Sequence, residues 1–201
     1  RKLCAPGGVP LRLALERADG SVSTFSTQVI TGDSRSVALS QRYIERIVKF
    51  LLWQRGGWKV YVGGPAAIGE YIKAAYAPGG ARAFDAEFMG GVYEHPFTVV
   101  VTSADKVPAE KESTTPLGRN LDGCRVGFDL GASDRKASAV VNGEAIYSEE
   151  VVWDPRNQSD PEYHYQGVLD SIRRAASKMP RLDAVGGSSA GVYINNRARV
   201  A

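Results

Sequence analysis

Residues 127–136 read Gly127-Phe128-Asp129-Leu130-Gly131-Ala132-Ser133-Asp134-Arg135-Lys136. In this run an apolar strand, residues 126–130, has an acid, Asp129, at its end, and a turn of small residues follows immediately. The backbone N–H groups of such a turn can approach an anion, while a carboxylate at the strand end can hold Mg²⁺ directly or through its water shell. The pattern therefore predicts a phosphate-binding strand–turn–strand over residues 125–142.

The turn supplies a defined set of candidate ligands. Asp129 is the candidate metal ligand, and the candidate phosphate and nucleotide contacts are Asp129, Gly131, Ala132, Ser133 and Lys136. Arg135 adds a second cation at the same turn. The alternative is a plain hairpin, in which Asp129 and Asp134 bond turn backbone and both cations lie in solvent.

The elements around this run indicate an α/β domain. The pattern predicts strands at residues 126–130, 136–141 and 145–152, a helix at 161–178, and a strand at 184–185 that enters a Gly/Ser turn. Asp160 and Pro161 supply the N-cap and first position of that helix. A three-stranded meander, a helix and a buried strand are typical of helices packed on a mixed sheet.

The run resembles the first phosphate motif of the actin-like ATPase superfamily, and most closely that of the ROK family of sugar kinases and regulators. That motif is written Asp-Ile-Gly-Gly-Thr, followed by a Lys and a small apolar strand. Asp129, Leu130, Gly131, Ser133 and Lys136 fall at matching places. Ala132 stands where the family has its second Gly.

A second match lies downstream, at Asp183-Ala184-Val185-Gly186-Gly187-Ser188-Ser189-Ala190-Gly191. It resembles the ROK stretch in which a buried strand leads through a Gly-rich turn toward the sugar pocket. Ala190 replaces a Pro that often precedes the family's last Gly. The resemblance implies that Gly187, Ser188, Ser189 and Gly191 contact a sugar, and the alternative is a Ser-rich turn that bonds only itself.

The ROK resemblance covers residues 125–201 and carries further implications. It implies an actin-like (ribonuclease H-like) ATPase lobe with a mixed sheet, ATP and Mg²⁺ as cofactors, and transfer of the γ-phosphoryl group to a sugar hydroxyl. The family's catalytic Asp lies in an Asn-Asp-Ala-like segment beyond the Gly-rich turn, so we expect the N-terminal portion of a longer kinase, inactive alone and without a catalytic residue of its own. A non-catalytic sugar-sensing regulator or scaffold on the same fold is the alternative.

The first half of the chain also reads as α/β, which disfavours the DNA-binding module of ROK regulators. The pattern predicts a hairpin of residues 11–17 and 21–30, helices near 34–55 and 66–76, and strands at 58–62 and 97–102, with a Gly90-Gly91 turn before the last. Residues 104–120 are rich in Lys, Glu, Ser, Thr and Pro and predict a surface linker. We therefore expect an α/β domain of unknown role at 1–115 and the incomplete lobe at 121–201.

Composition narrows the class of protein. With 201 residues, 43% hydrophobic residues and a net charge of +3, the chain predicts globular domains that bind neither nucleic acid nor membrane. Cys4 and Cys124 are too far apart for a zinc or disulfide pattern, which favours a reduced, cytoplasmic setting. His95 and His164 lack a neighbouring nucleophile and are expected to be structural. A homo-oligomeric state stays open.

Overall fold

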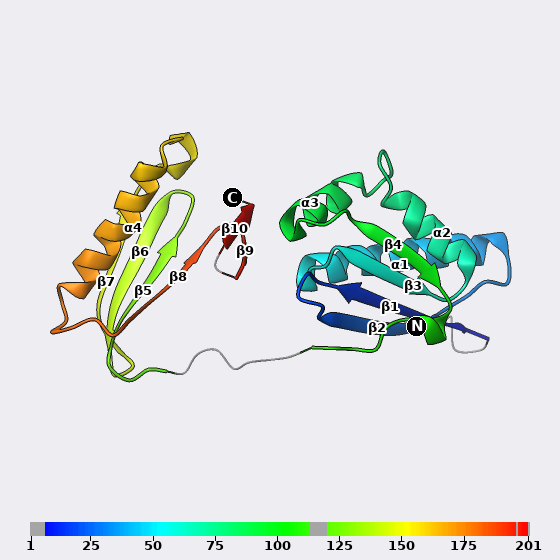
Figure 1. Ribbon diagram of the computed structural model, residues 1–201, viewed down its shortest axis with the longest axis horizontal. Helices are drawn as coiled ribbons and strands as arrows, with labels where there is room; N and C mark the ends of the chain where they lie inside the picture. Colours follow the sequence, from blue (N-terminus) through cyan, green and yellow to red (C-terminus); the bar gives the residue numbers. More distant parts are fainter. Residues whose placement is uncertain (1–6, 113–119, 196, 201) are drawn as a thin grey trace. The chain divides into compact units, whose positions relative to one another are not determined.

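The computed structural model describes residues 7–112, 120–195 and 197–200. Their contacts divide the chain into two compact units. Unit 1 comprises the described residues up to Glu112, and unit 2 begins, among the described residues, at Asn120. Each unit contains a mixed sheet with helices, which confirms the α/β class (Figure 1).

Unit 1 is built on a four-stranded sheet of order β2-β1-β3-β4. The elements follow the chain as β1 (Val9–Glu16), β2 (Val22–Val29), α1 (Ser34–Arg55), β3 (Lys59–Gly63), α2 (Ala66–Ala75), α3 (Ala83–Tyr93), β4 (Thr98–Thr102) and a short 3-10 helix, η2 (Ala104–Lys106). β1 pairs antiparallel with both β2 and β3, while β3 and β4 are parallel. The predicted hairpin and the strand–helix–strand that follows it are confirmed.

The side chain of Asp33 caps helix α1, because its Oδ1 accepts from the backbone N–H of Ser36 at 3.0 Å. Gly56, at φ 74°, ends the helix and donates to the carbonyl of Leu52. The apolar stripe of α1 packs with alternate residues of β1 and β3 in one core.

Helix α3 was not predicted from the sequence. We expected a turn at Gly90-Gly91, but both glycines lie inside the helix, which ends on Glu94 in a left-handed conformation. Glycine lowers helix propensity by about 1 kcal/mol relative to alanine, so the pair argued against a helix. Burial of Ala86 and Met89 in the unit 1 core outweighs that cost.

Residues 104–112 run over the surface, as their composition predicted, but they pack on unit 1 and are not a free linker. Val107 is 5% exposed and packs against Ala14 and Val22, on the face of the sheet opposite the main core. Lys111 exchanges two backbone hydrogen bonds with Val22, at 2.8 and 2.9 Å. Unit 1 therefore holds this segment as an added layer, and the predicted linker retains only its later part, of which residues 113–119 lie outside the described residues.

Unit 2 has a sheet of order β7-β6-β5-β8. Its elements are β5 (Cys124–Leu130), β6 (Asp134–Val141), β7 (Glu144–Val152), a 3-10 helix η3 (Pro155–Asn157), α4 (Pro161–Ala176), β8 (Ala184–Ser189), and a two-stranded ribbon of β9 (Val192–Ile194) and β10 (Arg197–Val200). β5, β6 and β7 form the predicted antiparallel meander, and β8 returns parallel to β5. Asp160 caps α4, as expected.

Helix α4 packs on one face of the unit 2 sheet. Val126, Ala137, Ala139 and Ala175 form the core between them. Because side chains alternate along a strand, Gly127 and Asp129 of β5 lie on the opposite face. This alternation decides which polar residues can reach the candidate site.

Candidate functional site

Asp129 lies where three strands meet in register. Across the antiparallel β5–β6 pair it faces Lys136, and across the parallel β5–β8 pair it faces Ser188. The hydroxyl of Ser188 donates to Asp129 Oδ1 at 2.5 Å. The two segments that the sequence singled out separately thus meet at the carboxyl ends of β5 and β8.

Residues 131–133 form the tight β5–β6 turn. Gly131 donates its N–H to the carbonyl of Asp134 at 2.8 Å, and a Cβ at position 131 would lie 2.9 Å from that same oxygen. Glycine is therefore required for close packing here. Ala132 and Ser133 are exposed, and within the described part of the chain their backbone N–H groups donate to no other group. These two amides are the free donors of the turn.

Trp153, just beyond β7, fixes the turn from the side. Its indole Nε1 donates to the carbonyl of Gly131 at 2.9 Å, and its backbone N–H donates to the carbonyl of Ser133 at 3.1 Å. Trp153 belongs to neither of the two sequence motifs. The one available signal was its position at the end of the third strand of the meander, since alternate strands of a meander end at the same edge of the sheet.

The charges around the turn are predominantly negative. Lys136 contacts Asp134 and lies 3.9 Å from Glu150, and the pKa of Lys136 is raised chiefly by its hydrogen bond to Asp134, with Glu150 and Asp129 adding smaller contributions. The same hydrogen bond from Lys136 lowers the pKa of Asp134, helped by Ser133. Three carboxylates around one ammonium leave two negative charges in excess, which favours a cation at this position.

Arg135 does not take part in the turn. The residue is 8% exposed, and its side chain points to α4, on the other face of the sheet from Lys136. The guanidinium donates to the carbonyl of Gly167 at 2.7 Å, to Ser171 Oγ at 2.5 Å and to Asp170 Oδ2 at 2.6 Å. The predicted second cation of the turn is therefore a structural residue that fastens α4 to β6.

The predicted sugar contacts are distributed over both faces of β8, which runs as a strand through residues we expected in a turn. Ser188 joins Asp129, but a Cβ at Gly187 would lie 2.2 Å from the Phe128 ring, so Gly187 packs on the α4 side. Ser189 donates to the carbonyl of Ala190 at 3.0 Å and contacts the Tyr193 hydroxyl at 2.5 Å. Gly191 lies in the bend before β9. Of these residues, Ser188 alone hydrogen-bonds to the Asp129 carboxylate.

A metal at this site would rely on few protein ligands. Among residues 7–112, 120–195 and 197–200, no group of three or more His, Cys, Asp or Glu side chains could hold a metal ion. Mg²⁺ needs no such group, because it is usually bound through one or two carboxylates, retained waters and substrate phosphates. Asp129 at a solvent-exposed strand end fits that mode of binding. In the same described ranges, no helix has the length and apolar character to cross a membrane.

Comparisons with known proteins give weak structural likenesses only. No family model matches the chain, and no curated protein matches it. An exopolyphosphatase from Cytophaga hutchinsonii is 10% identical over 90% of this chain, with a TM-score of 0.25. A PPX-GPPA enzyme of Aquifex aeolicus is 13% identical over 89% of this chain, with a TM-score of 0.22. The chain spans 64% of the length of each of these two structures.

Likenesses at this level assign no activity to the chain. The α/β class with mixed sheets rests on the strand pairings themselves. The ROK family is not supported by a family match. It stays a prediction from the two sequence motifs.

Proposed function

We propose that the carboxyl ends of β5 and β8 bind the Mg²⁺-bound phosphate groups of a phosphoryl-transfer substrate. The observation that carries the proposal is the register of Asp129 with Lys136 and Ser188 beside the two free amides of Ala132 and Ser133. Carboxylate, ammonium, hydroxyl and amide groups are those that a metal–phosphate complex requires. In this arrangement Asp129 holds Mg²⁺ or its water shell, and the turn amides face phosphate oxygens.

Because carboxylates outnumber cations at the site, phosphate groups are expected to bind there only together with the metal ion. A bare polyphosphate chain would be repelled by Asp129, Asp134 and Glu150, whereas Mg²⁺ would neutralise part of that charge and supply the electrostatic stabilisation of phosphoryl transfer. Trp153 holds the turn in place before any ligand arrives, which reduces the entropy lost on binding.

At the finer level, we propose ATP as the phosphate donor and a sugar as the acceptor, following the ROK resemblance. Ser188 would lie between the two ligands, because it shares the sheet edge with Asp129 and belongs to the second motif. The meander, helix and parallel strand are the order in which an actin-like lobe begins, which supports the same reading. We assign proton abstraction from the sugar to no residue of this chain.

Calorimetric titration of the 201-residue chain tests the phosphate site. We expect Mg·ATP to bind and ATP with EDTA to bind at least tenfold more weakly, because the metal offsets the carboxylates. Asp129→Asn should lower Mg·ATP affinity about ten- to a hundredfold, the range expected for losing a charged ligand. Asp122→Asn is the matched control, since the Asp122 side chain is 91% exposed and lies at the opposite end of β5. Equal binding by Asp129→Asn and the unaltered chain would refute the site.

Two further ligands separate the substrate classes. Mg²⁺ with inorganic tripolyphosphate tests whether phosphates alone suffice, and hexoses or N-acylhexosamines added to Mg·ATP test the sugar. Tighter Mg·ATP binding in the presence of one sugar supports the kinase. Tripolyphosphate binding equal to that of ATP, with no effect of any sugar, would retain the phosphate site and reject the sugar-kinase assignment.

A further inference from the structure

Helix α1 presents a row of large apolar side chains to solvent, on the side that faces away from the unit 1 core. Its buried residues belong to the core that the helix shares with the sheet. At about 3.6 residues per turn, the opposite side of the helix carries positions 39, 43, 46, 50 and 53, which we call the outward row. Four of these positions hold apolar side chains that are 40–60% exposed, namely Leu39, Tyr43, Phe50 and Trp53.

Aromatic rings of α3 widen the outward row at its C-terminal end. The ring of Trp53 is stacked on that of Phe88 at a centroid distance of 4.9 Å, and Phe84, which is 67% exposed, lies 6.0 Å from Phe88. The Trp53 indole Nε1 also donates to Asp85 Oδ1 at 2.8 Å, so this exposed ring is held in place before any partner arrives. Aromatic side chains that are ordered in advance lose little entropy on binding and commonly dominate the energy of an interface.

The spacing of the outward row indicates a helix as its partner. Its five positions are separated by 4, 3, 4 and 3 residues, which is the spacing of the contact row of a coiled coil. The middle position is the exposed Arg46, and one polar residue within such a row fixes the register and the choice of partner helix. A lipid surface requires an uninterrupted apolar face instead, and Arg46 interrupts this one.

Arg46 also disfavours a second copy of α1 as the partner. It is the midpoint of the outward row, so two copies that overlay their full rows, parallel or antiparallel, bring Arg46 against Arg46. Like charges at close range repel, most strongly where water is excluded. The row therefore suits a helix that differs from α1 and carries a carboxylate at the matching position.

The charges beside the outward row define the sign of that partner. Arg35, Arg42 and Lys49 follow one another at intervals of seven residues, so they line one side of the row and are called the basic flank. Within the described ranges, none of Arg35, Arg42 and Arg46 forms an ion pair. Lys49 lies 3.5 Å from Asp85. Charged residues at flanking positions pair across helix–helix contacts, so cations here call for acidic residues on the partner.

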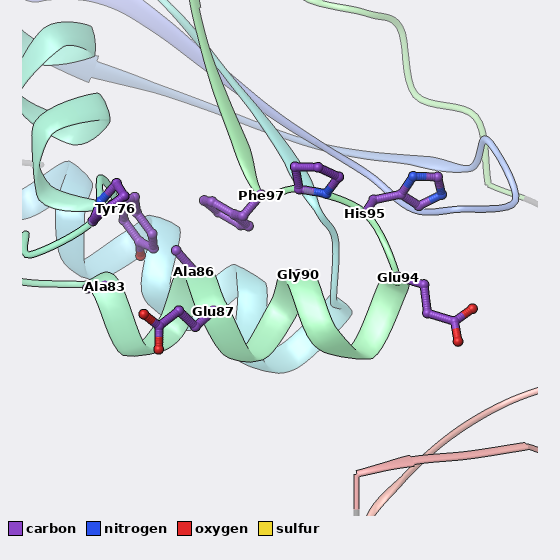
Figure 2. A pocket seen from close by; sticks show the side chains of 10 residues that line it. Tyr76, Ala83, Ala86, Glu87, Gly90, Glu94, His95 and Phe97 are labelled. Carbon is purple, nitrogen blue, oxygen red and sulfur yellow. The ribbon is translucent and has the colours of Figure 1, made fainter.

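The cavity beside α3 is a separate feature of unit 1. Its volume is about 440 Å³, and its lining residues run from Tyr76 to Phe97, so α1 contributes none of them (Figure 2). Binding at the outward row therefore requires neither this cavity nor the phosphate site, which belongs to unit 2.

We propose that the outward row of α1 docks an acidic amphipathic helix of a partner protein. The partner's own apolar row would pack along α1 from Leu39 to Trp53. One of its carboxylates would pair with Arg46, and further acidic residues would face the basic flank. Spacing, a central cation and flanking cations on one helix face correspond to these three sets of contacts.

A synthetic peptide tests the docking surface. The probe is about three heptads long, with Leu along its contact row, one Glu at the centre of that row and Glu at the flanking positions, where repulsion disfavours pairing with itself. Titration with the 201-residue chain should raise the fluorescence anisotropy of the labelled peptide, and the peptide should shift the amide signals of Tyr43, Arg46 and Phe50 in the ¹⁵N-labelled chain. A peptide with Lys in place of every Glu should bind at least about tenfold more weakly. Equal binding of the two peptides, or no binding of the acidic one, would overturn the proposal.

Two variants with matched controls locate the contacts. Phe50→Ser should weaken peptide binding about tenfold or more, whereas Ile146→Ser, at an apolar position of unit 2 that is 49% exposed, should leave it unchanged. Arg46→Gln should weaken peptide binding about five- to tenfold, whereas Lys73→Gln, at an exposed position on α2, should have no effect. Unchanged peptide affinity in Phe50→Ser and Arg46→Gln together would refute the assignment.

Two other occupants of the outward row would give different results. Self-association of the unaltered chain that Phe50→Ser abolishes would reject the acidic helix in favour of a second copy. Sedimentation with vesicles of phosphatidylserine and phosphatidylcholine that Phe50→Ser abolishes, without binding of the acidic peptide, would reject it in favour of a membrane surface.

Discussion

Replacement of Arg135 by Met removes the contacts that fasten α4 to the unit 2 sheet. Methionine retains the unbranched stem in the buried space but supplies none of the three hydrogen bonds to Gly167, Asp170 and Ser171. The hydroxyl of Ser171, a residue that is 1% exposed, would lose its donor. We expect unit 2, and not unit 1, to lose stability.

The size of the effect follows from the burial of each contact. A buried hydroxyl left unsatisfied costs about 1–3 kcal/mol. The ion pair with Asp170 adds at most about 1 kcal/mol, because the Asp170 side chain is 45% exposed and solvent screens the pair. The expected loss is therefore about 3 kcal/mol, which corresponds to a fall of about 12–24 °C in the melting temperature of a domain of this size.

Thermal unfolding followed by NMR separates the two units. The amide signals of Ala137 and Ala139 report unit 2, and that of Leu13 serves as an internal reference in unit 1. Arg173→Met is the matched control, since Arg173 is exposed on the same helix, and surface changes usually stay within about 0.5 kcal/mol. If Arg135→Met prevents folding, Arg135→Lys should give a smaller loss, because lysine retains one donor group.

The structural role of Arg135 is refuted if Arg135→Met lowers the unit 2 melting temperature no more than Arg173→Met does. It is refuted equally if Arg135→Lys behaves as the unaltered chain, because the planar guanidinium would then contribute nothing beyond its charge.

Two further predictions concern β8 and Asp183, the residue that precedes it. Gly187→Ala should destabilise unit 2 by about 1–3 kcal/mol, because the added methyl group would overlap the Phe128 ring. Gly186→Ala should change the stability little, because no atom lies within 4 Å of a Cβ at that position. Equal urea midpoints for the two variants would contradict this prediction. The hydrogen bond from Arg181, and next that from a backbone N–H, lowers the pKa of Asp183 below its ordinary value of 3.8. Stability from this group is present above pH 3.8 and lost as the pH falls through the lowered pKa, so Asp183→Asn should flatten the acid side of the unit 2 stability profile measured by urea unfolding.

The local sequence pattern was sufficient to predict most helices and strands of the fold. The first hairpin, helix α1 and the Asp160 cap of α4 each depend on neighbouring residues, and the structure has them where the sequence predicted. Helix α3 depends instead on burial against a distant core, which no local pattern reveals.

The candidate site was predictable in part for the same reason. The turn and its acid are local features, but β8 continues as a strand through Gly186 and Ser188 because β5 supplies a parallel partner. Its residues were read as a turn because glycine and serine are common in turns. The direction of Arg135 was equally inaccessible, since alternation along β6 places it on the α4 face while Lys136 faces the turn.

The indole of Trp153, which holds the β5–β6 turn, is also a fluorescent reporter of that turn. Trp153 is the only tryptophan after Trp58 in the sequence, and its Nε1–H is bonded directly to the Gly131 carbonyl. Any event that reorients this peptide changes the electrostatic field at the fluorophore. A chain in which Trp53 and Trp58 are replaced by Phe would therefore carry its own emission probe for the turn, with no label attached.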